Sequence, residues 1–152
     1  MGWKAGRQRR RSARSASHGL PEIAGFCVEE PVGEGGFSTV YRGAQETPAR
    51  PVAIKVFRTG GEVGARVRER FQRESAIIGE LSNEDGLVNV FTGGFTDSGA
   101  PYLAMELCEG GSIADQIRVH GPMPVDEVLA VGQRIGSALA VVHSKGIAHR
   151  DV

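Results

Sequence analysis

The chain has 152 residues, of which 40% are hydrophobic and 24% charged, and its 18 basic and 18 acidic residues give a net charge of zero. This length provides one ordinary domain or part of a larger one, and it leaves no room for a second complete domain. No apolar run approaches the roughly 18 residues of a membrane-spanning helix, so we expect no membrane segment in this chain. Cys27 and Cys108 lie far apart in apolar stretches, which indicates neither a zinc site nor a disulfide framework and favours a cytoplasmic location.

The zero net charge hides an uneven distribution along the chain. Residues 1–20 contain six basic residues and no acidic one, so the rest of the chain has a balance of −6. We interpret residues 1–25 as a basic, disordered tail. Contact of this tail with nucleic acid or anionic lipid is one hypothesis, and a tail that is only solvated, or a start codon assigned too far upstream, are the others. Nothing else in the sequence indicates nucleic-acid binding.

From residue 26 onward, short apolar runs separated by glycines predict the order β-β-β-α-β-β. The expected elements are a strand, glycine turn and strand over residues 26–44, a third strand over 50–57, a helix over 66–81, and two strands over 87–95 and 101–108. Two helices should follow. Ser112 and Asp115 form the pattern of a capping box for a short helix through Val119, and a longer helix should run from Val125 to Lys145.

The glycine-rich turn contains Gly33, Gly35 and Gly36. Residues without a Cβ atom let consecutive backbone N–H groups approach the oxygens of a phosphate. A dinucleotide-binding fold is excluded because a strand rather than a helix follows, and a Walker A loop is excluded because no Gly-Lys-Ser/Thr ending is present. A glycine-rich hairpin turn without a ligand remains an alternative for the isolated stretch.

Strand alternation over residues 50–57 divides the side chains between two faces, with Val52, Ile54 and Val56 on one and Ala53, Lys55 and Phe57 on the other. Lys55 should therefore lie among apolar neighbours, where its ammonium needs an anionic partner.

The helix over residues 66–81 offers such a partner. Its apolar stripe consists of Val67, Phe71, Ile78 and Leu81, and Glu74 falls in the gap of this stripe. We therefore expect Glu74 on the buried side of the helix, paired with Lys55.

These residues resemble the eukaryotic-like (Hanks-type) protein kinases, and in particular the bacterial Ser/Thr kinases. The motifs are the glycine loop "GEGGFSTV", the strand motif "VAIK", the helix segment "RFQRES", the hinge "MELCEGG" and the catalytic-loop opening "HRD". They occur in the family's order over residues 26–152, with Ser38 in place of the third glycine of the family's loop. The resemblance implies an α+β, protein-kinase-like fold, with an N-lobe over 26–105 (a five-stranded antiparallel sheet and one helix), a hinge over 106–111 and the start of a C-lobe over 112–152.

The resemblance also implies an ATP site. Its expected nucleotide contacts are Val32, Gly33, Glu34, Gly35, Gly36, Phe37, Ser38, Val40, Ala53, Lys55, Met105, Glu106 and Cys108. Lys55 would hold the α- and β-phosphates and be oriented by Glu74, while Met105 would stand behind the base. The carbonyl of Glu106 and the N–H of Cys108 would bind the adenine edge, leaving the Cys108 side chain as a small hydrophobic group.

Asp151 is the expected catalytic residue, which would accept or orient the proton of a Ser or Thr hydroxyl of a protein substrate. The family's ligands for Mg²⁺ are expected after Val152, so we expect no metal ligand in this chain. We therefore interpret the chain as the front part of an ATP- and Mg²⁺-dependent protein kinase, cut inside its catalytic loop and inactive by itself. A truncated nucleotide-binding or regulatory module and a pure interaction fragment are the alternatives.

Overall fold

The structure, a computed structural model, describes residues 19–59, 63–82 and 84–147. Our predictions for the basic tail up to residue 18 and for Asp151 concern residues outside this set. The elements are β1 Phe26–Glu34, β2 Ser38–Gln45, β3 Arg50–Phe57, α1 Ala65–Gly79, β4 Val90–Phe95, β5 Pro101–Met105, α2 Ile113–His120 and α3 Val125–Ser144. Their order confirms the predicted β-β-β-α-β-β pattern and the two helices after it.

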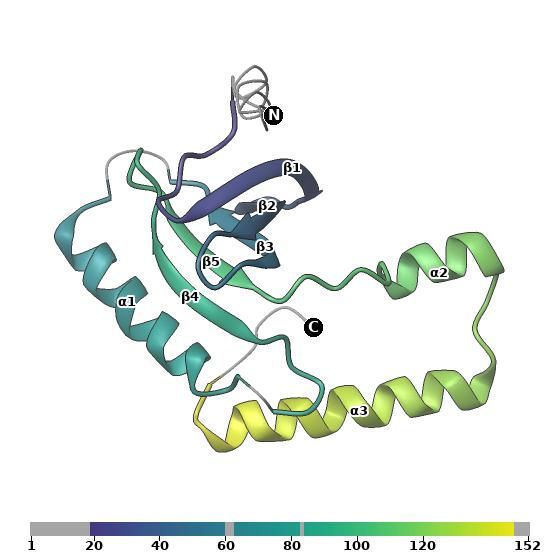
Figure 1. The fold of residues 1–152 in the computed structure, drawn as a ribbon. Coiled ribbons are helices and arrows are strands. Elements are labelled where there is room, and N and C mark those ends of the chain that lie inside the picture. The colour runs from purple at the N-terminus through teal and green to yellow at the C-terminus, as the bar shows by residue number, and fades with distance from the viewer. Residues whose placement is uncertain (1–18, 60–62, 83, 148–152) are drawn as a thin grey trace, which may run out of the picture.

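The five strands form one antiparallel sheet with the order β1-β2-β3-β5-β4 (Figure 1). The sheet and its helices confirm the α+β class. The helix α1 covers one face of the sheet, where the ring of Phe71 packs edge-on against Phe57 and Phe95 at centroid distances of 5.8 and 5.5 Å. The side chains that point to this face are therefore the ones that α1 can approach.

The opposite face of the sheet holds the main hydrophobic core. Val52 and Ile54 are fully buried there and cluster with Tyr102 and Ala104, while Val56 packs against the cluster. The alternation predicted for β3 is therefore confirmed. The cluster also includes Ile23, so the packed part of the chain begins before the boundary that we placed at residue 26.

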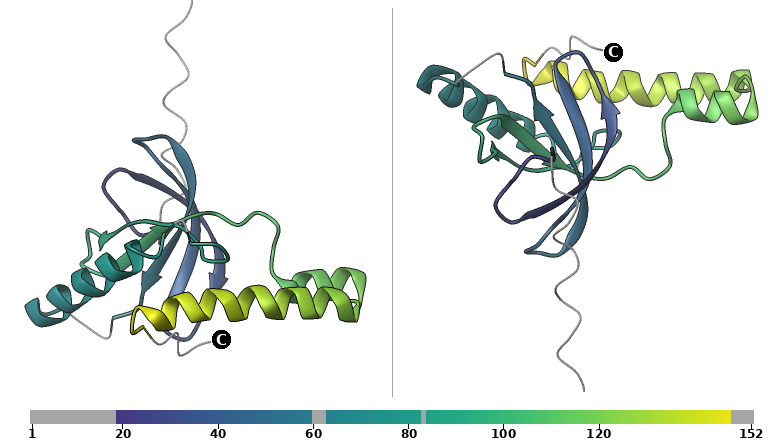
Figure 2. Two further views of the ribbon diagram at one scale, coloured as in Figure 1. Left: turned by 90° about the horizontal axis from the view of Figure 1, so that it is seen from below. Right: turned by 90° about the horizontal axis from the view of Figure 1, so that it is seen from above.

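The helices α2 and α3 follow the sheet and extend to one side of it (Figures 1 and 2). The Ser112 hydroxyl accepts a hydrogen bond from the N–H of Asp115 at 3.1 Å and the Asp115 carboxylate accepts one from the N–H of Ser112 at 3.0 Å, which confirms the capping box of α2. The Ser112 hydroxyl also donates a hydrogen bond to the Asp115 carboxylate at 2.6 Å, and this bond, together with the one from the Ser112 N–H, holds the pKa of Asp115 below its ordinary value. The C-terminal half of α3 is buried at Ala138 and Val142.

Neither α3 nor any other helix in the described ranges combines the length and the apolar composition needed to cross a membrane.

Candidate functional site

Four of the residues expected around a nucleotide lie on the same face of the sheet. In the strand register Val40 is opposite Lys55, and Ala53 is opposite Met105. Directly opposed residues of antiparallel strands point to the same side, and alternate residues of one strand share a face. The shared face is the one covered by α1, because Phe57 of the same strand also contacts α1. The structure therefore brings together a small residue, two apolar residues and the one lysine of this sheet.

Lys55 is half-buried on this face. Its Nζ lies 5.6 Å from the centroid of the Phe57 ring, and its cross-strand neighbours are Val40 and Leu103. The apolar surroundings predicted for this ammonium are thus present. A cation in such a position attracts an anion strongly, because few polar groups nearby compete for it.

The glycine loop joins β1 to β2 at the edge of this face. The N–H of Gly35 donates to the carbonyl of Ser38 at 2.9 Å, which closes the turn. Phe37, at the tip of the loop, is 87% exposed, and a Cβ atom at Gly36 would meet no other atom within 4 Å. The loop therefore has open space around its backbone, as the approach of a bulky anion requires.

The segment expected to act as the hinge begins directly after β5. The N–H of Glu106 donates to the carbonyl of Asn89 at 2.9 Å, and the side-chain amide of Asn89 donates to the Glu106 carboxylate at 2.9 Å. An ion pair of 3.6 Å between Arg42 and Glu109 ties the same segment to β2. Among the described residues, no group hydrogen-bonds to the Glu106 carbonyl or to the Cys108 N–H, the two backbone groups expected to bind the adenine edge.

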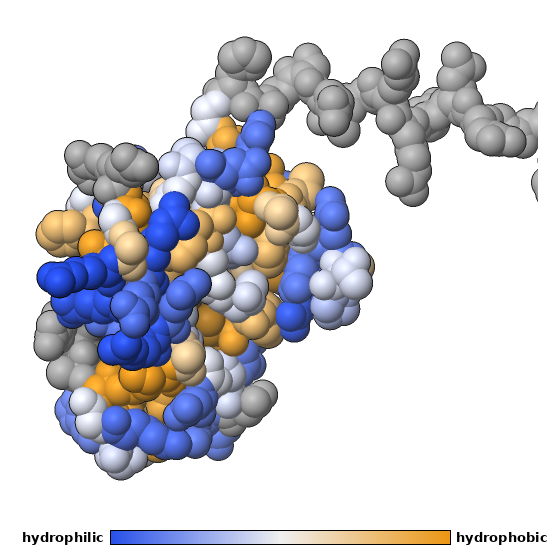
Figure 3. All heavy atoms as spheres, turned by 90° about the vertical axis from the view of Figure 1, so that its left-hand side faces the viewer, coloured by the Kyte–Doolittle hydropathy of each residue, from blue (hydrophilic) through white to orange (hydrophobic). Residues whose placement is uncertain are grey.

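The structure contradicts our prediction that Glu74 lies on the buried side of its helix beside Lys55. Glu74 is 55% exposed and pairs with Arg70 at 2.8 Å, and within the described ranges no ion pair joins it to Lys55. The pairing raises the pKa of the Arg70 guanidinium. Figure 3, which views the molecule from the side of α1, shows hydrophilic side chains gathered over this surface.

The physical reason lies in which residues of α1 face the sheet. After Phe71, the next residue that packs on the sheet is Ser75, one turn later, and it lies against Gly93 of β4. Glu74 is one residue earlier and therefore points about 100° away around the helix axis. Val67 of the predicted stripe is also 54% exposed. The stripe was placed correctly at Phe71, at the half-buried Ile78 and at the buried Leu81, and wrongly at Val67 and for the position of Glu74.

Cys27 and Cys108 form no disulfide, in line with the expectation, and both are exposed although they lie in apolar stretches of the sequence. Cys27 alternates with the inward-facing Phe26 and Val28 of β1, and Cys108 lies outside any helix or strand. The Cys108 side chain, expected to be a small hydrophobic group, is therefore exposed to solvent.

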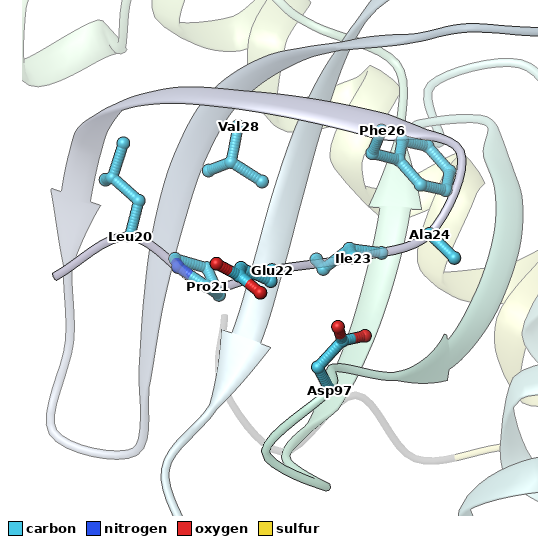
Figure 4. A pocket seen from close by; sticks show the side chains of 8 residues that line it. All are labelled: Leu20, Pro21, Glu22, Ile23, Ala24, Phe26, Val28 and Asp97. Atoms are coloured by element: carbon cyan, nitrogen blue, oxygen red, sulfur yellow. The ribbon is translucent and has the colours of Figure 1, made fainter. Parts of the chain in front are cut away.

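Two pockets lie apart from the residues expected to contact a nucleotide. One, of about 300 Å³, is on the core side of the sheet between β1 and the segment before it, with the carboxylates of Glu22 and Asp97 beside it (Figure 4). The other, of about 290 Å³, lies between α1 and β4 and includes Phe71, Ser75 and Gly93. Neither includes a residue that we predicted to contact a nucleotide.

Three polar residues near the expected site were missed by the sequence reasoning. Arg58 binds the glycine loop, Arg70 holds Glu74, and Asn89 anchors the hinge. Only Arg70 had a signal in the sequence, because its spacing of four residues from Glu74 is typical of helix ion pairs. The contacts of Arg58 and Asn89 span 24 and 17 residues, and no local pattern predicts them.

Fold and site together define a protein of the kinase class. The chain belongs to the protein kinase domain family, whose model matches residues 26–152. The Ser/Thr-protein kinase PknK of Mycobacterium tuberculosis is 38% identical over 129 residues, and PknL of the same species is 38% identical over 127 residues. The kinase pkn2 of Myxococcus xanthus is 37% identical over 127 residues.

The similarity extends to a solved structure, a mutant of the PknI kinase domain of Mycobacterium tuberculosis, with a TM-score of 0.71 and 27% identity. That match covers 85% of this chain and 52% of the PknI domain. The matches to PknK and PknL cover 85% and 84% of this chain but only 11% and 31% of those proteins. The protein-kinase-like fold and the membership of the bacterial Ser/Thr kinase family are thereby confirmed.

Proposed function

We propose that this chain forms part of a cytoplasmic enzyme that transfers the γ-phosphate of ATP to Ser or Thr hydroxyls of a protein substrate. The observation that carries the proposal is the common face of Val40, Ala53, Lys55 and Met105 beside an open glycine loop. An apolar face that carries a lysine beside an open glycine loop suits a flat base attached to a triphosphate.

The proposed roles follow the chemistry of each group. Val40 and Ala53 pack against the adenine, and the Glu106 carbonyl and Cys108 N–H form hydrogen bonds with its edge. The Lys55 ammonium holds the α- and β-phosphates, and the N–H groups of the glycine loop bind phosphate oxygens.

Two further groups complete the proposal. Glu74 would leave Arg70 and orient Lys55, and Asp151, outside the described residues, would accept or orient the proton of the attacking hydroxyl. Magnesium neutralises charge on the phosphates in this chemistry. In the described ranges no group of three or more His, Cys, Asp or Glu residues could hold a metal ion, so we assign no ligand and no step to it.

A Lys55→Met substitution tests the proposal in a protein that continues through the rest of the catalytic domain. Transfer of a radiolabelled γ-phosphate to the protein itself and to a basic protein substrate should fall to background. The fold should persist, because a long apolar side chain replaces the ammonium without opening a cavity. Lys145→Met, which removes an exposed lysine after α3, serves as the matched control and should transfer phosphate at the unaltered rate.

Undiminished transfer by Lys55→Met would contradict the role of Lys55. Binding of ATP without any transfer by the unaltered protein would instead support the alternative of a non-catalytic nucleotide-binding module.

A further inference from the structure

The glycine loop contains a carboxylate that does not suit a phosphate-binding role. Glu34 lies between Gly33 and Gly35, in the loop that we propose to bind the phosphates. A negative charge there repels a triphosphate unless a cation compensates it or the side chain is held away. Both conditions depend on where the structure places the Glu34 side chain.

The Glu34 side chain lies on the face of the sheet opposite to Lys55. Glu34 is paired with Thr39 across β1 and β2, and Thr39 is paired with Val56 of β3. The next pair along these strands is Val40 with Lys55, and because successive residues of a strand point to opposite faces, these two side chains point to the other face. The Glu34 side chain, which the resemblance placed among the nucleotide contacts, is thus separated from the proposed phosphates by the backbone of the loop.

Arg58 holds it there. Its guanidinium forms an ion pair with the Glu34 carboxylate and donates a hydrogen bond to the Thr39 hydroxyl at 3.3 Å. Its backbone N–H donates to the carbonyl of Phe37 at 2.8 Å. One residue at the end of β3 therefore binds the chain before the tip of the loop, at the tip and after it.

We propose that Arg58 is a positioning residue for the nucleotide, which acts by neutralising Glu34 and keeping its carboxylate on the face away from the phosphates. This inference rests on the proposed function, since it concerns ATP at the glycine loop. The two side chains are 48% and 74% exposed, so their pairing contributes little to folding. The main effect of the pair is to reduce the electrostatic repulsion between Glu34 and an anionic ligand.

A second mechanism leads to a different expectation. If the Arg58 guanidinium attracted the phosphates directly, its loss would weaken ATP binding whether or not Glu34 carried a charge. If Arg58 acts through Glu34, its loss should matter only while Glu34 is charged. A double-mutant cycle separates the two mechanisms.

The test measures the dissociation constants of ATP and adenosine by calorimetry, with the purified chain and the variants R58Q, E34Q and E34Q/R58Q. R58Q should bind ATP roughly three- to tenfold more weakly, because it leaves an uncompensated charge beside the phosphates. E34Q and the double variant should bind ATP within about twofold of the unaltered chain, and adenosine affinity should stay within about twofold throughout. The matched control is R73Q, which removes an arginine from another exposed pair, that with Glu69, and should leave ATP affinity unchanged.

Three outcomes would overturn the inference. An R58Q variant that binds ATP as the R73Q control does would show that Arg58 has no role in binding. An equal loss of affinity in R58Q and in the double variant would assign a direct contact instead of a positioning role. Absence of ATP binding by the unaltered, folded chain would remove the proposed nucleotide site together with the inference. If R58Q does not fold, the comparison of E34Q with the double variant still distinguishes the two mechanisms.

Discussion

At the scale of single residues, Glu74 is bound to the wrong cation for the proposed chemistry. Its carboxylate pairs with Arg70 one turn earlier on α1, whereas orientation of Lys55 requires it to turn toward the sheet. Both side chains of the existing pair are more than half exposed, and exposed helix pairs of this spacing are weak. Arg70 is therefore only a weak competitor of Lys55 for the Glu74 carboxylate.

Substitution of Arg70 by glutamine should strengthen ATP binding by about twofold at most, because it removes this competitor and leaves Glu74 free to meet Lys55. The measurement is the dissociation constant of ATP. Arg73→Gln provides the control, since it breaks the pair of the same spacing with Glu69. Unchanged or weaker binding in Arg70→Gln would mean that the pair does not limit the position of Glu74.

At the scale of elements, α1 is attached to the sheet through few contacts. None of its residues is fully buried, and its Ser75 lies directly against Gly93 of β4. A Cβ atom at Gly93 would lie 2.9 Å from the Ser75 hydroxyl oxygen and 3.0 Å from a methyl group of Leu103. The close approach of helix and strand therefore requires glycine at this position.

Gly93→Ala should consequently lower the free energy of unfolding by about 1–3 kcal/mol, because the added methyl group displaces α1 or Leu103. Denaturant unfolding followed by circular dichroism measures this change. Gly79→Ala, at the end of α1 where a Cβ atom would meet no other atom within 4 Å, should be neutral or stabilise by up to about 1 kcal/mol. Equal stabilities of the two variants would show that α1 does not depend on the Gly93 contact.

At the scale of the whole molecule, the described residues leave much of α3 without a packing partner. Its C-terminal half is buried at Ala138 and Val142, whereas Val125, Val128 and Leu129 in its N-terminal half are 75%, 52% and 63% exposed. Adjacent apolar side chains that remain in water are typical of a surface that another part of a protein covers.

We therefore expect the 152-residue chain to self-associate in solution, with light scattering giving a mass above that of one chain. Replacing Val128 and Leu129 together by glutamate should shift the mass toward the monomer, because the charges oppose burial of this surface. Gln133→Glu, which adds one charge at an exposed position of the same helix, should have little effect. A monomer with Val128 and Leu129 intact would contradict the expectation.

Most of the fold could be predicted because its signals are local in the sequence. Alternation along β3 placed Lys55 and Phe57 on one face and Val52 and Ile54 in the core, since the side-chain period of a strand is fixed at two. The capping box of α2 spans three residues and depends only on backbone groups within one turn. The division of residues 26–152 into N-lobe, hinge and C-lobe stays a prediction.

The order of the elements, the face on which Lys55 lies and the position of the glycine loop could be predicted from the residues alone. The rotation of α1 about its axis, and with it the exposure of Glu74, could not, because it depends on which residues of the helix meet the sheet, here Phe71 and Ser75. The pairing of Arg58 with Glu34, across 24 residues of chain, is likewise a tertiary contact. Contacts of this kind depend on which strands become neighbours in the sheet, and the periodicity of a single strand or helix contains no information about its neighbours.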